Sequence, residues 1–210
     1  MPGLLTLPDE VLLLILREPS LTYNDLKRVS RVSMRLHSLE QDESLDLKLF
    51  RKHLPAPSSS STDDQIVLCK RGVEVKNHPI LDRADLTADD LDEADVFGLD
   101  NVFLSDLACY HEMATSPPCR VLNFAMGGRP RARNETGVTV EDAIVTAVEM
   151  WDEELNEIDE RLYFDDPFSD EGRAHTWRDL LGDHCCWEGV REVTVIEPDV
   201  VSLRPESFGS

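Results

Sequence analysis

The sequence predicts an α+β protein, in which a small N-terminal unit of three helices precedes a larger mixed domain. Apolar residues recur at helical spacing through residues 7–50, which indicates packed helices. Residues 55–61 are rich in proline and serine and interrupt that pattern. Beyond them, helical periodicity at 144–162 is followed by strand-like alternation at 190–196. We therefore expect a helical domain at 4–54, a flexible linker at 55–64 and an acidic α+β domain at 65–210.

The first helix begins at a proline and is apolar on almost every side. Pro8 suits the first helical turn, where its missing N–H costs nothing. Asp9 and Glu10 then lie at the positive end of the helix dipole. The run at 11–16 leaves almost no polar face, so this helix must be covered on more than one side. Pro19 ends it, because a proline disfavours helical geometry in the residue before it.

A second helical stretch follows a polar break. Thr22, with Asp25 three residues later, predicts an N-terminal cap. Spacings of three and four residues predict one apolar stripe, made of Leu26, Val29, Val32 and Leu36. The stripe could be the core of a helical bundle or a binding face, and periodicity alone does not choose between them.

The acidity of the chain belongs entirely to its second part. The net charge is −21, from 21 Lys and Arg against 42 Asp and Glu. Residues 1–54 hold eight residues of each sign, so the remaining 13 basic and 34 acidic residues give 13 − 34 = −21. Such a surface repels phosphate backbones and anionic membranes, which argues against nucleic acid or a membrane as partner. It would steer basic protein partners toward the second domain.

The cysteine content predicts a reducing compartment. Five scattered cysteines are not a disulfide framework, and we expect a cytoplasmic or nuclear protein. The apolar run at 11–16 is too short to span a bilayer. It also follows acidic residues rather than a basic segment, so we expect no signal peptide.

The second domain alternates strand and helix patterns. Residues 102–107 and 120–125 are candidate strands, and residues 190–196 form a third that turns at 197–199 and returns at 200–203. Thr139 is a candidate cap for a long helix. Its apolar positions recur at four, three, four, three and four residues, through Ile144, Val148, Trp151, Leu155, Ile158 and Leu162. We also expect a short helix at 177–181.

Three features of the second domain could serve a site. Gly127 and Gly128 open a predicted loop with three arginines, for which we favour pairing with nearby carboxylates over target binding: Arg129, Arg131 and Arg133. The acidic run at 82–100 lacks the pattern of a calcium loop and is expected to be a solvated face. The adjacent residues 184–186, His-Cys-Cys, are poor metal ligands without distant partners, and we expect buried thiols beside Trp187. We predict no cofactor, metal or catalytic residue.

An ordered set of short motifs spans residues 7–50: Leu7-Pro8-Asp9-Glu10, Ile15-Leu16, Asp25-Leu26, Val32-Ser33 with Arg35, Asp42-Glu43-Ser44-Leu45, and Leu49-Phe50. In this order they resemble an F-box, the helical module that docks a protein onto the Skp adaptor of a cullin-RING ubiquitin ligase. The resemblance implies an apolar contact with the adaptor and places Glu10 at its rim. The contact would comprise Leu7, Pro8, Ile15, Leu26, Val29, Val32 and Leu36.

This F-box departs from the usual pattern in three places. Leu36 stands where many F-boxes have tryptophan or phenylalanine, and Asp46 stands where a tryptophan often follows the leucine. The segment between Ile15 and Leu26 is about two residues longer than usual. The first two changes remove aromatic area that normally anchors the third helix.

Residues 77–205 resemble, more weakly, an uncharacterised domain of basidiomycete fungi that sometimes follows an F-box. The motifs concerned are His78-Pro79-Ile80-Leu81, Ala114-Thr115-Ser116-Pro117-Pro118, Asn134, Gly137 to Ala143, and Trp187. This resemblance implies a fungal protein but no activity.

The two parts together predict a non-enzymatic substrate receptor of an SCF-type ligase. Its partners would be the Skp adaptor, the cullin scaffold and an unknown protein target. One alternative is a degenerate F-box whose acidic domain acts outside any ligase. Another is a thiol enzyme using Cys185 or Cys186 with His184 or His111, although no orienting third group is evident.

Overall fold

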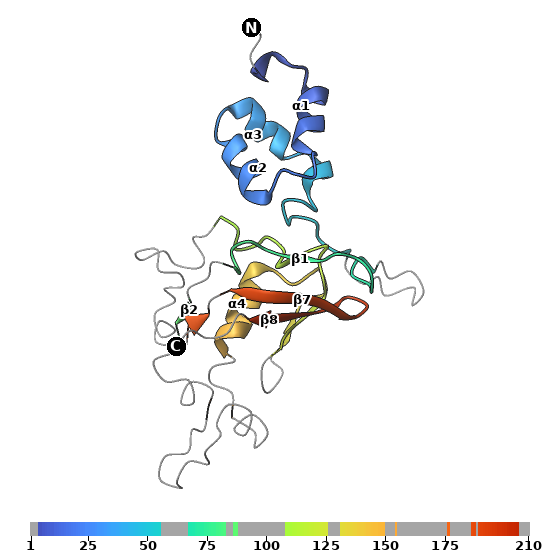
Figure 1. The fold of residues 1–210 in the computed structure, drawn as a ribbon, viewed down its shortest axis with the longest axis vertical. Coiled ribbons are helices and arrows are strands. Elements are labelled where there is room, and N and C mark those ends of the chain that lie inside the picture. Colours follow the sequence, from blue (N-terminus) through green and yellow to red (C-terminus); the bar gives the residue numbers. More distant parts are fainter. Residues whose placement is uncertain are drawn as a thin grey trace. The chain divides into compact units, whose positions relative to one another are not determined.

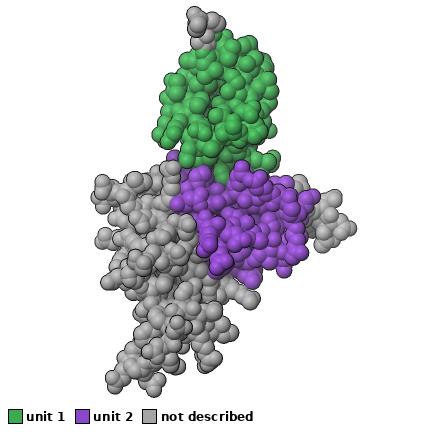
Figure 2. Space-filling model, in the orientation of Figure 1, with its two compact units in different colours: residues 1–52 green, residues 53–210 purple. Residues whose placement is uncertain are grey.

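A computed structural model describes two compact units, residues 1–52 (unit 1) and 53–210 (unit 2) (Figures 1 and 2). The described residues are 4–55, 67–82, 86–87, 108–125, 131–149, 154, 176, 186–187 and 189–205. Unit 1 is helical and unit 2 mixes strands with a helix, so the α+β prediction is confirmed. The expected linker at 55–64 lies outside the described residues except for Pro55. Leu54 donates its backbone N–H to Thr136 O (2.8 Å), so it belongs with unit 2.

Unit 1 contains three short α-helices and two 3₁₀-helices. The elements are η1 (Leu4–Thr6), α1 (Asp9–Leu16), α2 (Tyr23–Ser30), α3 (Met34–Glu40) and η2 (Glu43–Leu45). The predicted cap at α2 is a complete capping box: the Thr22 hydroxyl accepts from Asp25 N, and the Asp25 carboxylate accepts from Thr22 N. Hydrogen bonds from the Thr22 side chain and backbone hold the pKa of Asp25 below its usual value.

The predicted continuous apolar stripe is interrupted. α2 ends at Ser30, and Ser33 caps a new helix by accepting a hydrogen bond from Leu36 N (3.2 Å). Val32 therefore lies in the turn between α2 and α3 and is 69% exposed. Helical spacing alone could not detect this restart, because the serine cap changes the direction of the chain.

The core of unit 1 is built from leucines of separate elements. Leu16, Leu26, Leu45 and Leu49 pack together, with Val29 and others partly buried around them. Lys48 donates from Nζ to Leu16 O (3.2 Å), and this cation also bonds the Glu18 carbonyl. A positive charge at the C-terminal end of α1 complements the helix dipole there.

Unit 2 is organised around a four-stranded sheet of order β5-β4-β8-β7 (Figure 1). Its strands are β4 (Val121–Phe124), β5 (Arg131–Arg133), β7 (Val190–Glu197) and β8 (Val200–Pro205). β4 pairs with β8 in parallel, while β4–β5 and β7–β8 are antiparallel. Two short pairs stand outside this sheet: β1 (Lys76–Asn77) with β3 (Thr115–Ser116), and β2 (Leu86–Thr87) with β6 (Cys186–Trp187).

The strand predictions at 120–125, 190–196 and 200–203 are confirmed, whereas two other expectations are corrected. Residues 131–133 form β5 instead of a loop. The long helix is α4 (Val140–Glu149), and Glu154 forms an antiparallel bridge with Thr176, so the helix does not continue to 162. An extended backbone at Glu154 excludes the helical hydrogen bonds that periodicity predicted. The predicted strand at 102–107, the helix at 177–181 and most of the acidic run at 82–100 lie outside the described residues.

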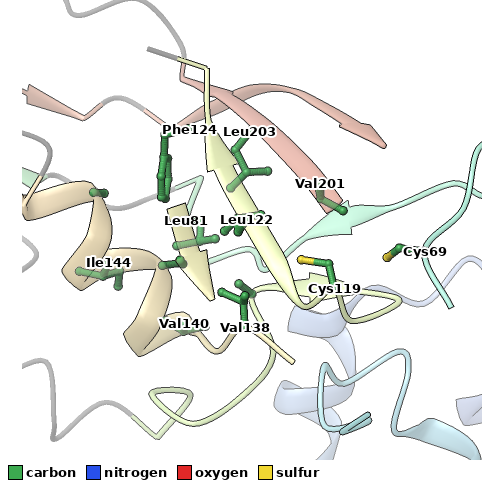
Figure 3. Close-up of a cluster of buried hydrophobic side chains, with 14 residues drawn as sticks. Cys69, Leu81, Cys119, Leu122, Phe124, Val138, Val140, Ile144, Val201 and Leu203 are labelled. Carbon is green, nitrogen blue, oxygen red and sulfur yellow. The ribbon is translucent and has the colours of Figure 1, made fainter. Parts of the chain in front are cut away.

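One face of the sheet packs against α4 (Figure 3). Leu122 and Phe124 of β4 and Val201 and Leu203 of β8 point into this core and are at most 3% exposed. Across from them, α4 contributes Val140, Ala143, Ile144 and Ala147. The Thr139 hydroxyl accepts from Asp142 N (3.1 Å), which confirms the predicted cap of α4.

A buried ion pair joins the start of β4 to the β7–β8 turn. The Arg120 guanidinium donates to the Asp199 carboxylate, and both residues are at most 8% exposed. The guanidinium also donates to Glu135 O (3.1 Å). The backbone of Asp199 adopts a left-handed conformation (φ 58°), accepts from Arg120 N and Val121 N, and donates to Cys69 O (2.8 Å). Arg120 and Asp199 thus connect four segments of the chain, at residues 69, 120–121, 135 and 199.

The motifs at residues 78–81, 114–118 and 137–143 mostly hold loops together. His78 N donates to Ala114 O, and Ala114 N donates to Val138 O, each at 2.8 Å. The buried His78 ring accepts from Ile80 N at Nδ1, so its Nε2–H faces Glu112 Oε2 (2.9 Å). Gly137 has φ 111°, and a Cβ there would lie 2.7 Å from Met113 Sδ.

Within the described residues, no helix is long and apolar enough to cross a membrane.

We predict that Arg120→Ala lowers the free energy of unfolding by about 3–5 kcal/mol, because it leaves the Asp199 carboxylate buried without its cation. Urea denaturation of the full chain, followed by tryptophan fluorescence, would measure this. Arg191→Ala, at an exposed arginine, is the control and should change stability by less than about 0.5 kcal/mol. Equal losses in the two variants would contradict a central role for the ion pair.

We also predict that Gly137→Ala costs more stability than Gly72→Ala. Both glycines have positive φ, but a Cβ at Gly72 would meet nothing within 4 Å. Gly72→Ala therefore reports the conformational cost alone, about 1–2 kcal/mol. Gly137→Ala adds overlap with the fully buried Met113, which should cost about 1–3 kcal/mol more. Thermal unfolding of both variants tests this, and losses of the same size would show that Met113 moves aside freely.

Candidate functional site

Exposed apolar side chains are concentrated on unit 1. Eight of the eleven large hydrophobic residues that are exposed in the described part of the chain belong to it. Contiguous exposed apolar patches on a folded domain usually mark interaction sites. These residues are Leu4, Leu5, Val11, Leu14, Ile15, Val32, Met34 and Leu47.

α1 separates a buried face from an exposed apolar face. Leu12 and Leu16 are 1% and 4% exposed and face the core. Val11, Leu14 and Ile15, at spacings of three and four, lie on the other side of the helix, and Leu14 is 65% exposed. The sequence predicted that this helix is covered on more than one side. The fold of unit 1 covers only one side, so the other stays exposed.

Arg35 fixes the N-terminal end of this surface. Its Nε donates to Asp9 Oδ1 (2.7 Å), and its terminal nitrogens donate to Leu5 O (2.6 Å) and Leu7 O (2.7 Å). The start of α3 is therefore held beside the segment that leads into α1. Met34, next to Arg35, is 83% exposed.

The predicted adaptor-binding residues divide by exposure. Pro8, Glu10, Ile15 and Val32 are exposed, and Leu7 is half-buried. Val29 is half-buried and packs against the unit 1 core. Leu26 and Leu36 are each 2% exposed, so they stabilise unit 1 and offer almost no side-chain area to a partner. Direct contact of these two with an adaptor, as expected from the sequence, does not fit this arrangement.

The two positions that lack the usual aromatics have other roles. Leu36 fills its place in the core with a smaller side chain. Asp46 accepts a salt bridge from Arg51 (3.1 Å), and Arg51 also donates to Glu40 O (2.7 Å) and Gln41 Oε1 (2.9 Å). Asp46 thereby links the end of unit 1 to the C-terminal end of α3 through polar contacts.

Sequence reasoning missed several exposed apolar residues, namely Leu4, Leu5, Val11, Leu14, Met34 and Leu47. The available signal was the run at 11–16, which has more apolar residues than one core face can bury. Met34 carried no such signal, since its exposure depends on the turn before α3.

The arginine group of unit 2 lies on the sheet. Arg131 and Arg133 are exposed on β5 and line a hollow of about 580 Å³, while Arg129 lies outside the described residues. In the described part of the chain neither Arg131 nor Arg133 forms an ion pair. The expectation that they pair with nearby carboxylates is therefore wrong for these two residues.

Two of the described thiols, Cys69 and Cys119, are poor nucleophiles. Burial raises the pKa of Cys69 and of Cys119 to about 12, which keeps both protonated near neutral pH. Of the proposed thiol-enzyme residues, His184 and Cys185 lie outside the described residues, while exposed His111 approaches Glu141 (3.6 Å). Among the described residues, no group of three or more His, Cys, Asp or Glu side chains could hold a metal ion.

Comparison with known proteins bears on unit 1. Residues 4–52 match the family model of F-box-like domains, and this range coincides with the helical unit. No curated protein and no solved structure matches the chain. The helices, their caps and the exposed apolar surface of unit 1 therefore belong to an F-box-like domain at residues 4–52.

Proposed function

We propose that this protein is the substrate receptor of an SCF-type cullin-RING E3 ubiquitin ligase. F-box domains typically bind the Skp adaptor in such complexes. The observation that supports the proposal most directly is the exposed apolar surface of the F-box-like domain, which has the character of an unoccupied protein interface. Unit 2 would hold the target, and the chain would act in the cytoplasm or the nucleus.

The proposed mechanism is proximity. The F-box-like domain holds the adaptor and, through it, the cullin scaffold, while the acidic domain holds a target protein. The ligase then presents its ubiquitin carrier to a target lysine at a high effective concentration. No residue of this chain takes part in the chemistry, so the protein itself is not an enzyme.

The adaptor contact would centre on α1 and the α2–α3 turn. Among the predicted contact residues, Ile15 and Val32 are large apolar residues that are exposed, with exposed fractions of 41% and 69%. Leu14 and Met34 extend the same apolar character. Exposed Glu10 would lie at the polar rim, where charges set orientation more than affinity.

A second candidate is a non-ligase interaction module with a degenerate F-box. The absence of aromatic side chains at Leu36 and Asp46 favours it, since both positions contribute less apolar area than usual. We also propose a fungal origin for the protein. A relation of residues 77–205 to an uncharacterised fungal domain is part of that proposal. The cullin scaffold and the target belong to the first candidate only.

Co-purification of the full chain with a fungal Skp adaptor tests the proposal. We expect a stable complex that is lost in the double variant Leu7→Ala/Pro8→Ala. Failure of the unsubstituted chain to bind would favour the degenerate F-box, because the domain would then lack its defining activity.

We predict that Ile15→Asp and Val32→Asp each weaken adaptor binding by about 30-fold, as expected for side chains that contribute about 2 kcal/mol at an interface. Both side chains are exposed, so stability should change by less than about 0.5 kcal/mol. Val145→Asp on α4 is a matched control, since Val145 is 42% exposed but lies outside the F-box-like domain. Calorimetric titration with the adaptor measures the affinities, and unchanged binding in both F-box variants would place the interface elsewhere.

Substitution of a predicted contact residue that is buried should lower stability, unlike substitution of exposed Ile15 or Val32. We predict that Leu36→Ala lowers the free energy of unfolding of unit 1 by about 2–5 kcal/mol, because it opens a cavity in a packed core. Met34→Ala on the same helix, at an 83% exposed position, should change it by less than about 0.5 kcal/mol. Chemical denaturation followed by circular dichroism at 222 nm compares the two variants. Similar losses would contradict the assignment of Leu36 to the core.

A further inference from the structure

The face of the four-stranded sheet opposite α4 is hollowed. The side chains that alternate with the buried ones on β4 and β8, such as Asn123 and Ser202, are half-buried and line a hollow of about 580 Å³. This volume lies in the range of about 300–1,000 Å³ that is usual for ligand sites. Arg131 and Arg133 of β5 form its basic side, and Glu197 of β7 is also part of its lining.

The strand register brings these side chains into two rows. Arg133 pairs with Val121, which pairs with Val200 on β8. In the next row, Asn123 lies between Arg131 and Ser202. Residues paired across strands have neighbouring side chains on the same face. Arg133 therefore lies beside the apolar side chain of Val121, whereas Arg131 lies beside the amide side chain of Asn123.

The two guanidinium groups are unneutralised in an acidic chain. Arg120 of the same unit is paired with Asp199, whereas Arg131 and Arg133 form no ion pair in the part of the chain that the structure describes. With a net charge of −21, carboxylates are the commonest charged groups available, yet none of the described ones lies within pairing distance. The hollow thus presents two cations that are free to bind an external anion.

A second group in the hollow also lacks a partner. The side-chain oxygen of Asn123 is buried and accepts no hydrogen bond. A buried acceptor without a donor is unfavourable, so such groups in folded proteins usually indicate a missing partner. Because this oxygen is shielded from solvent, a ligand in the hollow does not reach it in this side-chain conformation, so the two arginines define the ligand.

The spacing of the arginines matches an extended peptide. Arg131 and Arg133 are two residues apart on one strand, which places their Cα atoms roughly 6.8 Å apart. Side chains at positions i and i+2 of an extended peptide repeat at the same distance and point the same way. Two acidic residues separated by one residue would thus meet the two arginines together.

The remaining charges restrict where such a peptide binds. Glu197 lies on β7, three strands from β5 in the sheet order, or roughly 14 Å at the usual strand spacing. It would repel acidic groups from the far side of the hollow. At physiological ionic strength, charges more than about 8 Å apart are largely screened. Contact pairs with the arginines therefore outweigh the overall negative charge.

We propose that this hollow binds an extended acidic segment of the target, in which two Asp or Glu residues are separated by one residue. Arg131 and Arg133 each pair with one carboxylate of the segment. That the segment belongs to a ubiquitination target rests on the proposed function. The rest of the target surface is free to be basic and to complement the acidic surface of the domain.

A fluorescent peptide tests the proposal directly. Fluorescence anisotropy of the full-length chain is measured with a labelled Gly-Glu-Ala-Glu-Ala-Gly peptide and with an isomer that has adjacent glutamates, Gly-Glu-Glu-Ala-Ala-Gly. We expect the spaced peptide to bind at least fivefold more tightly than the isomer. Arg131→Gln/Arg133→Gln should weaken its binding at least tenfold. The control Arg71→Gln/Arg191→Gln removes the same charge from exposed arginines elsewhere in unit 2 and should change binding by less than twofold.

Three outcomes would overturn the proposal. These are no saturable binding of the spaced peptide, equal binding of the two isomers, and equal losses in the two arginine variants. The comparison of isomers on the unsubstituted chain stands even if a variant folds poorly. Co-purification with the adaptor is measured on Arg131→Gln/Arg133→Gln in parallel. On the unsubstituted chain, adaptor binding without any peptide binding rejects the hollow alone, whereas peptide binding without adaptor binding rejects the ligase role alone.

Discussion

The architecture of unit 2 depends on the buried pair formed by Arg120 and Asp199. One residue precedes β4 and the other precedes β8, and the parallel register of these strands begins directly after them, at Val121 and Val200. Parallel pairing between distant segments has no turn to set its register. The ion pair and the two backbone hydrogen bonds accepted by the Asp199 carbonyl provide that constraint. A one-residue slip would exchange the two faces of the sheet.

The β4–β8 register determines which side chains lie next to each other on both faces of the sheet. On the inner face it aligns Leu122 with Val201 and Phe124 with Leu203, which forms the core against α4 (Figure 3). On the outer face it aligns Asn123 with Ser202 and sets them beside the arginines of β5. The interaction that stabilises the domain therefore also builds the hollow. Substitutions at Arg120 would be expected to affect stability and the proposed peptide site together.

Unit 1 divides its apolar residues between a buried core and an exposed surface. Its leucine core is small, and Leu36 and Asp46 replace the larger aromatics that the resemblance led us to expect. Polar contacts of Arg35, Lys48 and Arg51 with backbone carbonyls hold the short helices together. This arrangement leaves the outer face of α1 and the α2–α3 turn apolar and exposed. The F-box-like domain thus buries one set of apolar residues in its core and leaves another set exposed, which we propose as the adaptor contact.

The sequence by itself determined the local structure and the class of the N-terminal domain. The caps at Thr22 and Thr139, the helix at residues 9–16, and the strands at 120–125 and 190–203 all follow from neighbouring residues, whose preferences are readable along the chain. Only the tertiary structure decided which apolar residues are buried, that Val32 lies in a turn, and that α4 ends before Glu154. It also decided that Arg131 and Arg133 lie on a strand without an ion pair to any described residue. These features depend on contacts between residues far apart in the sequence, and periodicity or composition contains no information about such contacts.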